Sequence, residues 1–91
     1  MTKMENLGKE LVEKLISCFD KLEFRARIGD TSRSVEFFVW IDGERKQCYE
    51  LADSAKIDEV AMERLFDDFA ESVRKSDEYK RGEVNKVQFE T

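Results

Sequence analysis

The stretch SVEFFVWIDGERKQCYEL, residues 34–51, decides the fold of this 91-residue chain. Its first eight residues are β-branched or aromatic except Ser34 and Glu36, which is typical of a strand. Asp42 and Gly43 then form a turn signal, because Asp-Gly is a preferred pair in tight hairpins. The residues after the turn can return as a second strand, so the stretch predicts an antiparallel β-hairpin.

The length of the turn determines which side chains share a face of the hairpin. A two-residue turn, Asp42-Gly43, would set Val39 opposite Lys46. A three-residue loop with Gly43 as a left-handed bulge residue would instead place Tyr49 and Leu51 on the apolar side, together with Val35, Phe37 and Val39. We expect the three-residue loop, because it gathers Tyr49 and Leu51 with the other apolar residues, and a slip of one residue would turn that whole set outward.

The segment before the hairpin predicts one helix and one strand. Thr2 and Glu5 have the spacing of a capping box, and apolar residues then recur every three or four positions, which predicts an amphipathic helix over residues 3–21. Phe24, Ala26 and Ile28 alternate with charged residues and predict a strand.

The segment after the hairpin predicts a second helix and a last strand. Asp58 is a suitable N-cap, and a stripe of apolar residues follows it at helical spacing: Met62, Leu65, Phe66, Phe69 and Val73. The stretch SDEYKRGE is expected to be a loop, with a strand near 84–90. The predicted fold is therefore a two-layer α+β domain, 1–91, ordered as helix, three-stranded antiparallel meander, helix and strand.

Composition argues against several classes of function. The chain carries a net charge of −5, and residues 58–71 hold six acidic residues against one basic residue, Arg64. A protein that binds DNA or RNA directly carries an excess of basic residues on the contact face. No apolar stretch is long enough for a membrane span, and no signal-peptide pattern begins the chain. We expect a cytoplasmic protein with no membrane or nucleic-acid partner.

The sequence shows no recognisable catalytic site, although carboxylates are plentiful. There is no histidine, and the four glycines are isolated, so no phosphate-binding glycine loop is present. Cys18 and Cys48 have no activating base nearby and are interpreted as small buried hydrophobes. The sequence predicts a non-enzyme with no cofactor and no metal site.

The predicted second helix carries an acidic ladder, defined here as Glu59, Glu63, Asp67 and Glu71, with Asp68 beside it. Like charges four residues apart repel each other by about 0.2–0.5 kcal/mol per pair. One interpretation is a solvated face whose acids pair with neighbouring bases on the same helix. The other is an interface for a basic partner, whose approach the ladder would accelerate.

Two aromatic residues of the hairpin suggest a second surface. If the helices cover the Val35 side of the strand, Phe38 and Trp40 point to the opposite side. Aromatic side chains are frequent at the centres of interfaces. The alternatives are that another part of the chain covers them or that a homodimer does.

The order of these segments resembles the YezG-like bacterial immunity proteins. The resemblance is carried by an N-terminal amphipathic helix, SVEFFVWIDGERKQCYEL, the helix segment IDEVAMERLFDDFAESVRKS and the final YKRGEVNKVQFET. It implies an antidote that binds and blocks a cognate toxin, often a nuclease with a basic active site.

Two other classes remain open beside the immunity protein. One is an acidic inhibitor of another nucleic-acid-handling protein, such as an anti-CRISPR protein or a DNA mimic. The other is an adaptor subunit that uses Phe38 and Trp40.

Overall fold

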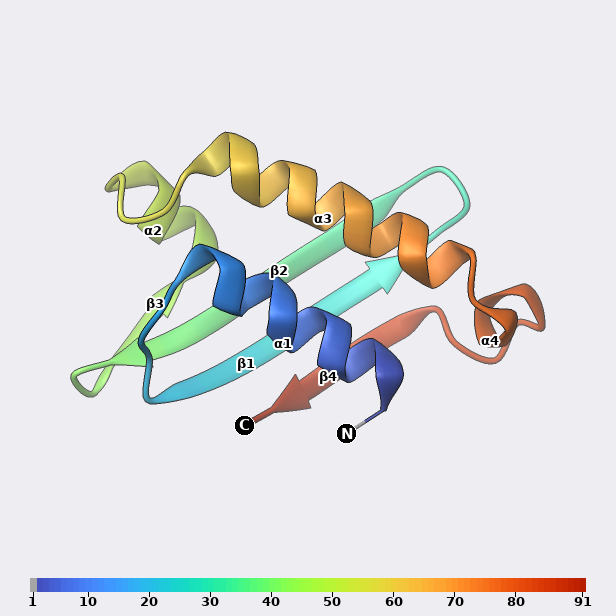
Figure 1. Cartoon of the computed structure of the whole chain (residues 1–91), viewed down its shortest axis with the longest axis horizontal. Coiled ribbons are helices and arrows are strands. Elements are labelled where there is room, and N and C mark those ends of the chain that lie inside the picture. The colour runs from blue at the N-terminus through green and yellow to red at the C-terminus, as the bar shows by residue number, and fades with distance from the viewer. Residues whose placement is uncertain (1) are drawn as a thin grey trace.

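The computed structural model describes residues 2–91 and contains four helices and four strands within them. Figure 1 shows their arrangement. In chain order they are α1 Lys3–Leu15, β1 Lys21–Ile28, β2 Arg33–Ile41, β3 Glu44–Gln47, α2 Cys48–Asp53, α3 Glu59–Arg74, α4 Asp77–Lys80 and β4 Lys86–Glu90.

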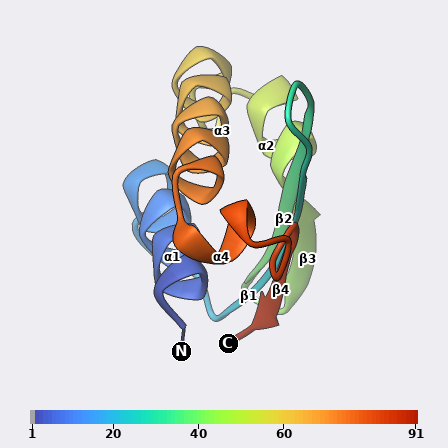
Figure 2. The same ribbon diagram turned by 90° about the vertical axis from the view of Figure 1, so that its right-hand side faces the viewer.

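The four strands form one antiparallel sheet in the order β3-β2-β1-β4. The first three strands form the predicted meander. The last strand, β4, pairs with β1 on the side of β1 that faces away from β2. Helices α1 and α3 lie side by side over one face of the sheet, and the other face has no helix over it (Figure 2). The predicted two-layer α+β architecture is confirmed. We call the face without helices the open face.

The hairpin turn differs from the prediction. Asp42 and Gly43 both have positive φ, at 52° and 82°, and Val39 pairs with Lys46. These values identify a two-residue turn, so the predicted three-residue loop is wrong. A two-residue turn with both central residues in the left-handed region already matches the right-handed twist of the flanking strands. The hairpin therefore needs no additional bulge residue at Gly43.

The returning strand is also shorter than predicted, because it ends at Gln47 and residues 48–53 form α2. Gln47 caps this helix, since its side chain accepts from the Tyr49 N–H and Glu50 reaches back to the Gln47 N–H. The helical turn buries Cys48 and Leu51 and leaves Tyr49 partly exposed against Phe66. Local capping therefore replaces strand pairing after four residues.

The first helix begins as predicted and ends early. The Thr2–Glu5 capping box is present, but α1 stops at Leu15, six residues before the predicted end. Lys21 already belongs to β1, and Leu22 pairs with Val39 in the sheet, fully buried. Leu15, Cys18 and Leu22 continue the helical spacing by coincidence, since the chain needs residues 16–20 to reverse direction.

The later elements follow the sequence closely. Asp58 caps α3 by accepting from the Ala61 N–H, as predicted. The stretch predicted to be a loop contains one short helix, α4, capped by Ser76. The last strand occupies residues 86–90, within the predicted range.

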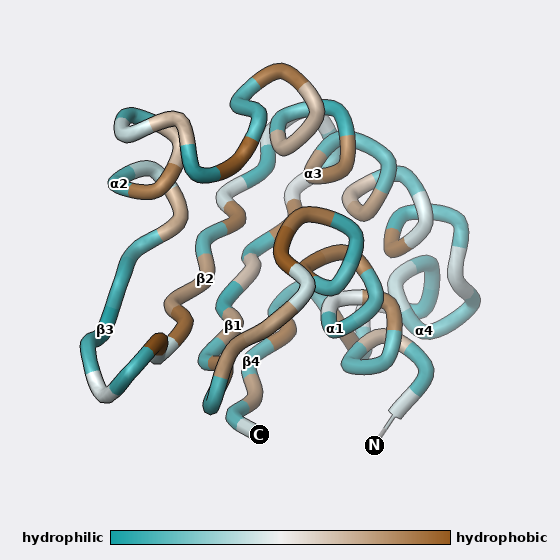
Figure 3. Tube along the Cα trace, turned by 60° about the vertical axis from the view of Figure 1, so that its left-hand side comes forward, coloured by the Kyte–Doolittle hydropathy of each residue, from teal (hydrophilic) through white to brown (hydrophobic). Residues whose placement is uncertain are grey.

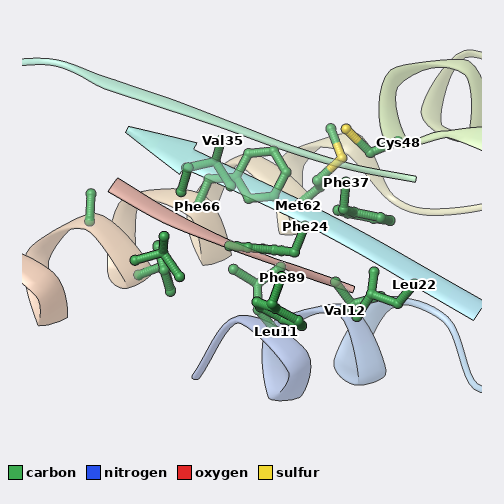
Figure 4. Packing of buried hydrophobic residues seen from close by; sticks show 14 of the residues in the cluster. Leu11, Val12, Leu22, Phe24, Val35, Phe37, Cys48, Met62, Phe66 and Phe89 are labelled. Atoms are coloured by element: carbon green, nitrogen blue, oxygen red, sulfur yellow. The ribbon is translucent and has the colours of Figure 1, made fainter. Parts of the chain in front are cut away.

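The core lies between the sheet and the two long helices. Phe24 of β1 is fully buried, with its ring centroid 5.3 Å from that of Phe69 in α3 and 5.3 Å from that of Phe89 in β4. Phe37 and Phe66 form a second edge-to-face pair, at 6.3 Å (Figure 4). Hydrophobic and hydrophilic residues alternate along the strands and the helices (Figure 3), and the buried hydrophobic residues form one core cluster.

Candidate partner-binding surfaces

The middle of the acidic ladder is paired with a residue of the sheet. Arg33, the first residue of β2, donates from its Nε to Asp67 Oδ1 at 2.7 Å and from Nη2 to Glu63 Oε2 at 2.6 Å. The two carboxylates therefore share one guanidinium, which offsets the repulsion between them. This pairing joins residues 30 and 34 positions apart in the chain.

The guanidinium of Arg33 is largely enclosed at this site. Its carbon lies 5.5 Å from the centre of the Phe66 ring, a cation–π contact. Burial alone would lower the pKa of Arg33, but its hydrogen bonds to Glu63 and Asp67 outweigh burial and raise the pKa above the ordinary value. Arg33 therefore stays charged and holds α3 to the start of β2.

The end of the ladder is paired as well. Arg74 donates to Glu71 Oε1 at 2.7 Å, on its own helix. The same guanidinium donates to the Gly29 and Ser32 carbonyls, both at 2.8 Å, which fixes the loop between β1 and β2. The ladder acids were expected to pair with bases on the same helix, as Glu71 does with Arg74, whereas the role of Arg33 was missed.

Two of the predicted acidic contact residues differ from the others. Within residues 2–91, Glu59 and Asp68 form no ion pair. Asp68 lines a groove between α1 and α3 together with Glu10 and Lys14, over an apolar floor that includes Leu7 and Leu65. Asp68 thus lies on the α1 side of α3, while Glu63 and Asp67 lie on the β2 side. The five acids do not form one continuous surface.

Phe38 and Trp40 lie on the open face, on the opposite side of the sheet from α3. Both are partly exposed and are approached by cations. The Arg45 guanidinium carbon is 3.7 Å from the centre of the Phe38 ring and 5.6 Å from that of Trp40, and the Lys21 ammonium is 4.7 Å from the Trp40 ring. The aromatic pair is therefore a cation-covered patch rather than a bare apolar one.

A buried carboxylate holds two of the guanidinium groups near Phe38, those of Arg25 and Arg45. Glu23 of β1 is buried next to Phe38, its cross-strand neighbour. Its carboxylate accepts a hydrogen bond from Arg25 and lies 3.6 Å from the Arg45 Nη2. Because an unpaired carboxylate at this depth would be costly, Glu23 orders both guanidinium groups over the aromatic patch.

The two sides of the molecule carry charge of opposite sign. The open face carries five basic and three acidic residues, which gives +2: Lys21, Arg25, Arg27, Arg45 and Lys86 against Glu23, Glu36 and Glu90. Since the whole chain carries −5, the rest of the molecule carries −7. A basic partner is attracted to the helical side and repelled by the open face. The ladder and the Phe38–Trp40 patch therefore fit different partners.

The cysteines have different environments. Cys48 is buried, as predicted, and burial raises the pKa of its thiol. Cys18 is exposed in the connection between α1 and β1, so its interpretation as a buried hydrophobe is wrong. The helix was predicted to continue through Cys18, and its early end removes the packing that would have covered the side chain.

Among residues 2–91, no group of three or more histidine, cysteine or acidic side chains has the arrangement of a metal site. Over the same residues, none of the helices combines the length and the apolar character that crossing a membrane requires. No protein-family model matches the chain, and no curated protein matches it either.

Proposed function

We propose that this chain is a non-catalytic acidic protein that binds a basic toxin domain and blocks its active site, as an immunity protein does. The observation that carries the proposal is the separation of charge, +2 on the open face and −7 over the rest of the molecule, which includes the helices. A nuclease toxin presents a basic cleft to its nucleic acid. An acidic helical surface complements such a cleft and accelerates its capture.

The proposed contact surface is centred on the groove between α1 and α3. Asp68 and Glu10 line this groove beside Lys14, whereas Glu59, about two and a half turns before Asp68, lies on the opposite side of α3. Leu7 and Leu65 at the groove can hold the aliphatic stem of a lysine or arginine from the partner, while the carboxylates bind its charged end. Glu63, Asp67 and Glu71 contribute less, because Arg33 and Arg74 already neutralise them.

The same surface would serve an acidic inhibitor of another nucleic-acid-handling protein. The two functions differ in the partner rather than in the chemistry of the interface. An adaptor function would instead use Phe38 and Trp40, and the cations over them favour an acidic partner. A basic partner is therefore expected to bind the helical side rather than the open face.

Protection from a neighbouring gene product tests the proposal. The genes that flank this one would each be expressed in a heterologous bacterial host, with and without this chain. We expect one of them to stop growth alone, to encode a domain with a basic cleft, and to be harmless when this chain is co-expressed. If no flanking product is toxic, or if toxicity persists with this chain present, the immunity function is wrong.

Two matched substitutions then locate the interface. Asp68→Lys changes the charge of the groove by two units, and Glu36→Lys makes the same change on the open face. We expect Asp68→Lys to weaken toxin binding at least tenfold and to reduce its salt dependence, with Glu36→Lys close to wild type. The reverse result would move the interface to the open face.

A further inference from the structure

Strand β4 forms an edge of the sheet whose outer side has no strand beside it. It pairs with β1 alone, and it lies at one end of the strand order (Figure 1). Lys86, Gln88 and Glu90 are all exposed. An edge of this kind presents backbone donors and acceptors that can pair with another chain.

The hydrogen bonds to β1 show which residues of β4 point their backbone groups outward. The Ile28 N–H donates to the Asn85 carbonyl at 2.8 Å, and the Thr91 N–H donates to the Leu22 carbonyl at 2.9 Å. Bonded and non-bonded pairs alternate along an antiparallel ladder. Val87 and Phe89 therefore bond toward β1, and Lys86, Gln88 and Glu90 direct their N–H and C=O groups to the outer edge.

The charges on β4 are unfavourably placed against β1. Glu90 lies opposite Glu23, and Lys86 lies opposite Arg27. Both are non-bonded pairs of the ladder, in which cross-strand side chains approach most closely, and like charges there destabilise the sheet. Glu23 is compensated by Arg25 and Arg45. Over the described chain, by contrast, Arg27, Lys86 and Glu90 have no ion-pair partner.

We propose that β4 pairs with β4 of a second copy of this chain, antiparallel and about a two-fold axis at Gln88. In this register Lys86 lies opposite Glu90 of the second copy, and Glu90 lies opposite its Lys86. The three outward-pointing residues of each strand then exchange backbone hydrogen bonds with the other copy, which is the geometry that the alternation requires. The two sheets join into one.

The sequence of β4 complements itself in this register. KVQFE places lysine against glutamate at both ends, valine against phenylalanine on the helix-covered side, and glutamine against itself at the axis. Each lysine and glutamate gains an opposite charge that its own chain does not provide. A parallel copy, or a shift by two residues, loses at least one of these pairs.

The other edge of the sheet lacks these features. Strand β3 spans four residues, and its Lys46 already pairs with Glu44 at 3.1 Å and approaches Glu50 at 3.9 Å. No charged residue of β3 lies opposite a like charge in β2. Short length protects an edge from pairing. Because Lys46 and Glu44 already have partners of opposite charge within one copy, a second copy offers them little. The β4 edge is therefore the one that fits a second copy.

The dimer goes beyond the proposed toxin binding and does not depend on it, since β4 is separate from the groove that Asp68 lines. Sedimentation equilibrium of wild type from about 10 µM to about 1 mM tests it. We expect the average mass to rise from one chain toward two. A wild type that stays monomeric at about 1 mM overturns the proposal.

Charge reversal at the two ends of β4 gives the decisive comparison. Lys86→Glu leaves two acids on the edge and Glu90→Lys leaves two bases, so each variant alone should dimerise at least tenfold more weakly. An equimolar mixture should form a heterodimer, because every cross-copy pair is again of opposite sign. Single variants that dimerise like wild type, or a mixture that stays monomeric, overturn the register.

Weaker dimerisation of the two charge-reversal variants should not result from unfolding. Lys86→Glu places an acid opposite Arg27, and Glu90→Lys places a base opposite Glu23, so both changes relieve like-charge pairs within one copy. We expect their thermal midpoints to equal or exceed that of wild type. Glu44→Lys, on the other edge, is the matched control and should dimerise like wild type.

Gln88→Pro, at the proposed two-fold axis, tests the backbone hydrogen bonds of the interface rather than its charges. The N–H of Gln88 points outward, so Gln88→Pro removes no hydrogen bond to β1. It removes the donor at the centre of the proposed interface. We expect a monomer with the circular dichroism spectrum of the folded chain, and a dimer that persists in Gln88→Pro overturns the proposal.

Discussion

Gly8 of α1 lies directly against the ring of Phe24 in β1. A Cβ at Gly8 would stand 3.0 Å from Phe24 Cε1 and 3.1 Å from two further ring carbons. The ring has little freedom to move, because Phe69 and Phe89 each hold it at a centroid distance of 5.3 Å. Gly8 therefore allows the helix to approach the sheet, and its low helix propensity is the local cost of that approach.

Gly8→Ala is expected to destabilise the protein by about 1–3 kcal/mol, because overpacking a rigid core exceeds the gain in helix propensity. Propensity alone predicts the opposite sign, a gain of about 1 kcal/mol. Urea unfolding measures the difference. Glu13→Ala, at an exposed position of the same helix, serves as the control and should stay close to wild type.

Two apolar residues of α3 should respond differently to truncation. Phe69→Ala removes a buried ring that packs edge-to-face on Phe24, and about 3–5 kcal/mol of stability should be lost. Leu65 is only partly buried, at the groove beside α1, so Leu65→Ala should cost less than 2 kcal/mol. The sequence alone placed both residues on one buried stripe. Equal losses in chemical denaturation would show that Leu65 is as enclosed as Phe69.

Arg33→Ala should destabilise the fold by about 1–3 kcal/mol, since it leaves Glu63 and Asp67 adjacent without their shared cation. Lysine at both Glu63 and Asp67 should also destabilise it, because three cations would then meet. The repulsion between the ladder acids, taken alone, predicts the opposite sign, a small gain in stability. Thermal melts in low and high salt provide the measurement, and wild-type stability in both variants would exclude a structural role for the ladder.

Alkylation should distinguish the two thiols. Cys18 is exposed and should react in the folded protein, whereas Cys48 should react only after unfolding. Burial also raises the pKa of Cys48, so its contribution to stability is present below the ordinary thiol pKa of about 8.5 and is lost as the pH rises above it. Mass spectrometry of Cys18→Ser with an alkylating reagent at pH 8 follows Cys48 alone. Rapid labelling of folded protein would contradict the packing around α2.

The sequence could predict those elements whose signals are local. The Thr2–Glu5 and Asp58 caps, the apolar stripe of α3 and the meander each depend on residues a few positions apart. The predicted end of the first helix was wrong because helical and strand patterns overlap there. Leu22 continues the apolar spacing of α1, although it belongs to β1. The turn was mispredicted because a longer β3 was assumed, and the Gln47 cap ends that strand.

The candidate site depended on contacts that composition cannot reveal. The ladder was visible in the sequence, but Arg33 lies 30 residues from Glu63 and its pairing follows from how α3 crosses β2. Likewise, the alternation of β2 predicted that Phe38 and Trp40 share a face. It gave no sign of the cations that Glu23 holds over them. Contacts between residues far apart in the sequence therefore determine the charge that each of the two surfaces presents to a partner.

Trp40 gives the chain a natural optical reporter of its open face. It is the one tryptophan in the sequence, and its indole lies beneath the Lys21 ammonium and near the Arg45 guanidinium. A local positive potential attracts anions, so iodide should quench its emission more efficiently than caesium does. Molecules that bind over Phe38 and Trp40 should shift this emission. Those that settle on α1 and α3 leave the spectrum as it was, so one unlabelled sample distinguishes the two docking sides.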